Sequence, residues 1–63
     1  RLWTAIEGLA DDLREVFLLY TFQGLKYREI ADLLGIPLGT VMSRLHTARQ
    51  RIRQHLGEEE VEA

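Results

Sequence analysis

The 63-residue sequence contains no cysteine, so it can form neither a disulfide framework nor a thiolate metal site. Its two histidines, His46 and His55, have few carboxylates beside them, and we therefore expect no metal and no other cofactor. No apolar run approaches the roughly 20 residues that a membrane-spanning helix needs, and the chain does not start with the pattern of a signal peptide. These absences predict a cytoplasmic protein without membrane contact.

Signs of catalysis are also missing. There is no cluster of carboxylates on one face, no glycine-rich phosphate loop after a strand, and no nucleophile with an evident base. Ser43 and His46 stand three positions apart on an expected helix, but such pairs arise by chance far more often than as catalytic dyads. We therefore expect no enzymatic activity.

Acidic residues are absent from Pro37 to Leu56, although the chain as a whole has a formal net charge of −2. The segment from Lys26 to Leu56 carries six basic residues and two acidic ones, whereas residues 1–25 and 57–63 are both acidic on balance. A basic segment between acidic ends is the kind of charge asymmetry that nucleic-acid-binding domains show. Arginines that simply form the solvated face of a helix are an equally good explanation of the charge alone.

What the sequence does contain is apolar periodicity. A hydrophobic content of 46% is enough for a compact core, even though a chain of this length buries only about 60% of its unfolded surface. The periodicity predicts an all-α fold, a small four-helix domain with a C-terminal helix-turn-helix. We expect one domain over residues 1–57, helices over 2–8, 12–22, 27–34 and 38–56, and an acidic, disordered tail over 58–63. Because the chain begins with Arg1 and not Met, we also expect it to be part of a longer protein.

Local signals set the expected helix ends. Asp11 and Asp12 offer cap oxygens and negative charge where the second helix begins. That helix is apolar around most of its circumference, which predicts a central position in the domain. Gly35 permits a reversal of the backbone, Pro37 presets the first turn of the last helix, and Gly57 is expected to end it. Trp3 is expected to cover one end of the core.

The last expected helix has an apolar stripe that must face the core, formed by Leu38, Val41, Leu45, Ala48, Ile52 and Leu56. Its early exposed positions are small or polar: Gly39, Thr40, Ser43 and Thr47. Such residues let a helix approach another surface closely and can bond to phosphates or base edges. In a purely structural alternative, Gly39 merely admits the preceding helix and Thr40 caps the turn, but this leaves the missing acids unexplained.

Together these residues carry a family likeness. DLREVFLL followed by GLKYREIADLLGIPLGTVMSRLHTAR resembles region 4 of bacterial sigma factors, specifically the extracytoplasmic-function (group IV) class, from about Leu9 to Leu56. LuxR-type regulators share REIA and GTV, but a shorter helix with a different pattern follows in them. The resemblance implies a four-helix domain that binds the −35 promoter element in the major groove. It also implies contact with the beta-flap of RNA polymerase, and with an anti-sigma factor in some members.

The resemblance also implies which positions contact DNA. Tyr27 and Arg28 match positions that meet the phosphate backbone. Arg44 and Arg49 match recurrent arginines. Of the two, Arg44 is expected to contact DNA, whereas for Arg49, beside the buried stripe, we expect an internal ion pair with Glu15 or Glu29. The turn and the early recognition helix match the remaining DNA-contacting positions: Pro37, Gly39, Thr40, Met42, Ser43, His46 and Thr47.

Met42 and Thr47 depart from the family pattern, because many relatives have a basic residue at each position. Base readout is therefore expected to depend on Ser43 and His46, on apolar contact with thymine methyl groups and on DNA shape. Two other readings of the chain remain open at this point. One is a module whose main role is to bind an anti-sigma factor or the polymerase flap, and the other is a LuxR-type regulator that dimerises on paired half-sites.

Overall fold

A computed structural model describes the backbone of residues 1–62 and the side chains as far as Gly57. Four α-helices follow one another: α1 (Leu2–Glu7), α2 (Asp11–Thr21), α3 (Tyr27–Leu34) and α4 (Leu38–Glu62). The predicted all-α fold with a C-terminal helix-turn-helix is confirmed, because the described part of the chain contains helices, short connections and no strand.

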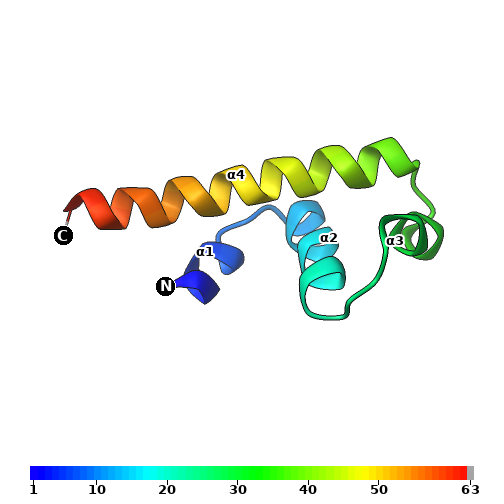
Figure 1. Cartoon of the computed structure of the whole chain (residues 1–63), viewed down its shortest axis with the longest axis horizontal. Helices are drawn as coiled ribbons and strands as arrows, with labels where there is room; N and C mark the ends of the chain where they lie inside the picture. Colours follow the sequence, from blue (N-terminus) through cyan, green and yellow to red (C-terminus); the bar gives the residue numbers. More distant parts are fainter. Residues whose placement is uncertain (63) are drawn as a thin grey trace.

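The longest helix, α4, is the axis of the molecule (Figure 1). Its 25 residues span roughly 37 Å at 1.5 Å per residue, close to the 41 Å length of the whole chain. The three shorter helices lie along one side of it, with α1 beneath its C-terminal half, α2 near its middle and α3 at its start. α2 was expected to be central and touched on several sides, and it lies between α1 and α3 with contacts to both α3 and α4. The helix that all three others share as a partner is α4.

All four helices and one connection contribute to a single core. The α4 stripe supplies Val41, Leu45, Ala48 and Ile52, all buried as expected. The two ends of that stripe depart from the prediction, because Leu38 is exposed and Leu56 is half-buried. The remaining core residues come from the other helices and from the connection after α1: Ala5, Ile6, Leu9, Leu13, Val16, Phe17, Ile30 and Ala31. Trp3, in contrast, is 55% exposed and does not cover the core as predicted.

Four predicted helix ends differ from the structure, and two of them change the role of a named residue. Ala10 is the N-cap of α2, so Asp11 and Asp12 lie in the first helical turn and favour the helix through their charge near its positive end. At the other end of the chain, α4 continues through Gly57 to Glu62. Gly57 does not have the positive φ that would end a helix, and glycine within a helix is unfavourable by about 1 kcal/mol but not forbidden. Of the predicted acidic tail at 58–63, the side chains and all of Ala63 lie outside the described residues.

The turn between α3 and α4 forms as the sequence predicts. Gly35 is left-handed, with φ of 68°, and it ends α3. The amide of Ile36 donates to the carbonyl of Ala31 at 3.1 Å, which closes the last turn of α3. The carbonyl of Pro37 then accepts from the amides of Thr40 and Val41, at 3.0 and 3.2 Å, so α4 starts directly after the proline. This short connection fixes α3 at the start of α4.

Candidate nucleic-acid interface

The start of α3 presents one tyrosine and one arginine beside the recognition helix. The carboxylate of Glu29 accepts a hydrogen bond from the amide of Lys26 at 2.8 Å, which gives one half of a capping box. The other half cannot form, because an ammonium group has no lone pair with which to accept a bond. Arg28 is exposed, and the half-buried ring of Tyr27 packs against Tyr20 of α2 with 5.2 Å between centroids. The position of Tyr27 is therefore fixed by a contact inside the domain, while Arg28 reaches into solvent.

The first two turns of α4 present the predicted small and polar residues on an open surface. Pro37, Met42, Ser43 and His46 are exposed, and Thr40 and Thr47 are half-buried. A Cβ atom built on Gly39 would meet nothing within 4 Å beyond its chain neighbours and the backbone of its own helix, so this glycine is not needed to admit α3. The purely structural explanation of Gly39 is therefore wrong. Its missing side chain leaves space toward the outside of the molecule.

Ser43 turns its hydroxyl back onto its own helix. The Oγ atom donates to the carbonyl of Thr40 at 3.3 Å, which leaves the hydroxyl lone pairs available to accept from outside. Ser43 can therefore receive a hydrogen bond from a base amino group without losing its bond within the protein.

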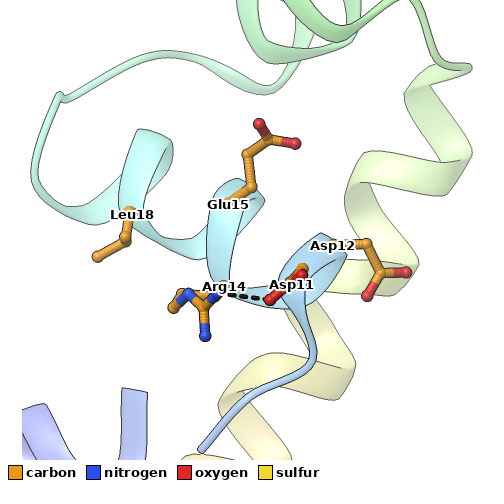
Figure 2. Close-up of a pocket in the computed structure, with 5 residues that line it drawn as sticks. All are labelled: Asp11, Asp12, Arg14, Glu15 and Leu18. Atoms are coloured by element: carbon orange, nitrogen blue, oxygen red, sulfur yellow. Dashed lines mark hydrogen bonds and ion pairs between the residues drawn. The ribbon is translucent and has the colours of Figure 1, made fainter. Parts of the chain in front are cut away.

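Arg44 lies on a different flank of α4 from this open surface. Its Nε atom is 3.7 Å from a carboxylate oxygen of Asp12, and its side chain is 30% exposed. Figure 2 shows Asp12 directed toward α4, while Glu15 points away and Arg14 pairs with Asp11. The second oxygen of Asp12 accepts from the amide of Leu13 at 2.8 Å, which holds the carboxylate in place for Arg44. Arg44 thus joins α4 to the first turn of α2.

Arg49 joins α4 to the other end of α2. Its guanidinium carbon lies 5.2 Å from the centroid of the Tyr20 ring, which is a cation–π geometry. The predicted ion pair with Glu15 or Glu29 is wrong, since no carboxylate of the described residues lies within ion-pair distance of Arg49. The crossing of α2 over α4 brings a ring, and not a carboxylate, to the border of the buried stripe. Arg44 and Arg49 therefore hold opposite ends of α2.

This arrangement of a short helix, a tight turn and a long helix agrees with the family comparison. Residues 1–52 match the family model described as "Sigma-70, region 4". The chain belongs to this family. Region 4 of the sigma-70 family is a helical, DNA-binding, helix-turn-helix domain, and the resemblance predicted from the sequence is thereby confirmed.

Curated relatives of this region 4 domain are extracytoplasmic-function sigma factors. The chain is 42% identical over 55 residues to the ECF RNA polymerase sigma factor SigE of Mycolicibacterium smegmatis. This match covers 87% of the chain and 21% of that protein. The chain is 43% identical over 51 residues to the ECF RNA polymerase sigma-E factors of Escherichia coli and Salmonella typhimurium. These matches cover 81% of the chain and 27% of each protein. The chain thus spans about a quarter of the length of the relatives it matches.

Most of the predicted DNA-contacting residues of this region 4 domain come together at one end of the molecule, where α3 meets α4 (Figure 1). Arg44 is the exception, because its partner is within the domain. The partners of Arg44 and Arg49, which are Asp12 and Tyr20, were not predicted. Both residues lie on α2, and only the crossing of the two helices shows which of its side chains meet α4.

No group of three histidine, aspartate or glutamate residues in the described part of the chain is arranged to hold a metal ion. None of its helices combines the length and the apolarity needed to cross a bilayer.

Proposed function

We propose that this chain binds the −35 element of promoter DNA, as region 4 of an extracytoplasmic-function sigma factor that directs RNA polymerase to start transcription. The observation that carries the proposal is the exposed surface on the first turns of α4. That surface combines an open glycine, two half-buried threonines and exposed Ser43 and His46, and no acid occurs from Pro37 to Leu56. A polyanion can approach such a surface without charge repulsion.

In this proposal α4 enters the major groove with its N-terminal turns. Ser43 and His46 bond to base edges, and the turn residue Pro37 together with Gly39 allows close approach to the groove. Thr40 and Thr47 flank these positions and donate to phosphates or bases. Tyr27 and Arg28 contact the phosphate backbone from the start of α3 and set the register of the domain on the duplex. Arg44, paired with Asp12, holds α4 in position and does not read bases.

Binding of the 63-residue chain to short DNA duplexes, followed by fluorescence anisotropy, tests the proposal. The probes are a random-sequence duplex and duplexes selected from a random pool by the chain itself. With few phosphate contacts, we expect weak binding to the random duplex, with a Kd of about 10⁻⁴ to 10⁻⁶ M. Affinity should fall as salt rises between about 50 and 200 mM, because counterions are released on binding. Absence of salt-sensitive binding to every duplex would contradict the proposal.

Substitutions separate phosphate contacts from base contacts. Arg28→Gln should weaken binding to selected and random duplexes alike and reduce the salt slope by about one. Arg1→Gln removes the same charge from the far end of the molecule, near α1, and should leave both measurements unchanged. Ser43→Ala and His46→Ala should instead change which sequences are selected. An equal effect of Arg28→Gln and Arg1→Gln would mean that only the net charge matters.

A second surface favours a protein partner as well. Leu2, Trp3 and Phe22 are 50%, 55% and 57% exposed, and the Trp3 and Phe22 rings meet edge to face with centroids 6.3 Å apart. We propose that this apolar patch contacts the beta-flap of RNA polymerase or an anti-sigma factor. Clustered exposed aromatic side chains are typical of protein interfaces, and Trp3 belongs to α1, which packs on α4 away from the DNA-facing end.

A purified flap fragment provides the test of the apolar patch. Trp3→Ala should weaken its binding at least tenfold if Trp3 is a central contact, with no change in DNA binding. Leu33→Ala, at a leucine that is 63% exposed on α3, is the matched control and should leave flap binding unchanged. If Trp3→Ala and Leu33→Ala behave alike, the patch is not the docking site. Both functions place the chain in the cytoplasm with the polymerase and the promoter.

A further inference from the structure

Met42 is the unusual residue on the proposed DNA-reading surface. It is 51% exposed, although methionine is apolar and the residues beside it on that surface are small or polar. The exposed half of the side chain contributes nothing to packing within the chain, so it is available for contact with a partner. Among the described residues of α4, the other large apolar side chain that is exposed is Leu38, which is 36% exposed and lies one helical turn earlier.

The surroundings of this apolar pair indicate what it would contact. Ser43 and His46 lie on the next positions around the helix, and both carry hydrogen-bonding groups. Since the stretch from Pro37 to Leu56 has no carboxylate, the surface as a whole suits DNA better than a basic or neutral protein partner. Within the major groove, the C5-methyl group of thymine is the base feature that apolar side chains recognise.

We infer that Met42 reads the methyl group of a thymine in the major groove, with Leu38 extending the apolar surface beside it. The inference rests on the proposed DNA-binding function and names the base that this position would select. Its long, unbranched side chain has three rotatable bonds and a polarisable sulfur, so it can adapt its shape to a methyl group without a hydrogen-bonding partner. A basic residue at the same position would instead favour guanine, whose groove edge carries two acceptors.

Replacement of thymine by uracil tests this inference, because it removes one methyl group and leaves every hydrogen-bonding group in place. Duplexes selected by the 63-residue chain are resynthesised with deoxyuridine in place of each thymidine in turn. At one position we expect an affinity about three- to fivefold lower, as the burial of one methyl group predicts. Met42→Ala should bind the thymine and uracil duplexes equally. Met42→Arg should select guanine where the unmodified chain selects thymine.

Two controls make the result specific. Leu33→Ala removes a similarly exposed apolar side chain from α3 and should keep the full preference for thymine over uracil. Thermal unfolding of Met42→Ala should match that of the unmodified chain, because an exposed methionine contributes little to stability.

The possible failures are distinct. If no duplex shows salt-sensitive binding, the proposed function itself fails. If binding is salt-sensitive but thymine and uracil duplexes bind equally, or if the selected sites contain no thymine, only the role of Met42 is overturned. An equal loss on uracil substitution in the unmodified chain and in Met42→Ala would assign the methyl contact to another residue.

Discussion

Arg14 joins the first two helices at a point where backbone carbonyl groups have no hydrogen-bond partner within a helix. One of its guanidinium nitrogens lies 3.3 Å from the carbonyl oxygens of both Glu7 and Leu9, at the end of α1 and just after it. The other nitrogen pairs with Asp11 in the first turn of α2. Carbonyls at a helix C-terminus have no partner within the helix, so a side chain that donates to them stabilises the connection. Arg14 therefore fixes α1 against the start of α2.

Arg14→Met should lower the free energy of unfolding by about 1 to 2 kcal/mol, because it removes charge-assisted bonds and keeps most of the apolar stem. Urea unfolding followed by circular dichroism measures this change. Arg51→Met, at an exposed arginine of α4, removes the same charge and should change stability by less than about 0.5 kcal/mol. Equal losses for the two variants would mean that the contacts of Arg14 contribute nothing specific.

At the same scale, single residues show where sequence reasoning reaches its limit. The helical angle of Arg49 predicted correctly that it borders the core stripe, but not that Tyr20 would be its neighbour. A periodicity describes one helix at a time, whereas an ion pair or a cation–π contact depends on how two helices cross. The pairing of Arg44 with Asp12 was not predicted for the same reason. Arg44 is therefore paired within the domain, and its predicted contact with DNA stays a prediction.

Among the helices, the connection from α3 to α4 depends on two glycines with opposite roles. Gly35 has a φ of 68°, which other residues rarely adopt, and it ends α3. Gly39 has no such requirement, because it lies in the first turn of α4 and a Cβ atom there would meet nothing. Gly35 is needed for the backbone conformation that ends α3, whereas Gly39 leaves the surface of α4 without a side chain.

Alanine at each position should therefore change stability in opposite directions. Gly35→Ala should lower the free energy of unfolding by about 1 kcal/mol or more, since alanine is strained at positive φ. Gly39→Ala should raise it by up to about 1 kcal/mol, because alanine favours the helix. If the proposed function is correct, Gly39→Ala should also weaken DNA binding, since the added methyl group holds the helix away from the groove. Thermal unfolding and anisotropy on the same samples measure both effects, and unchanged DNA binding by a stabilised Gly39→Ala would contradict the proposed close approach.

The helices themselves were well predicted because the apolar period is a local property. The range 27–34 was predicted without error, and α1 and α2 differ from their predicted ranges by one residue at an end or at both. The end of α4 was missed because glycine only permits a left-handed stop, and Gly57 does not take that conformation. The predicted contacts with DNA stay predictions, since a chain alone shows which side chains are exposed and not what they bind.

For the whole molecule, α4 is the helix without which the other three have no shared partner. The last fully buried residue in the described part of α4 is Ile52. A chain stopped after Thr47 loses Ala48 and Ile52 and should not fold, because a domain of this size has only a few kcal/mol to lose. Circular dichroism melting curves of this truncated chain and of the full chain test this, and a cooperative transition in the truncated chain would contradict it.

The position of α4 at the end of the described chain also has a consequence for biosynthesis. Ribosomes make the chain from its N-terminus, so α1 and α2 emerge before the helix on which they pack. At about 5 to 20 residues per second, the interval from Thr21 to Ile52 lasts roughly two to six seconds. During that time Leu13, Val16 and Phe17 have no α4 to cover them, so these apolar side chains stay uncovered until α4 follows. The core of this domain therefore cannot be completed until α4 has been synthesised.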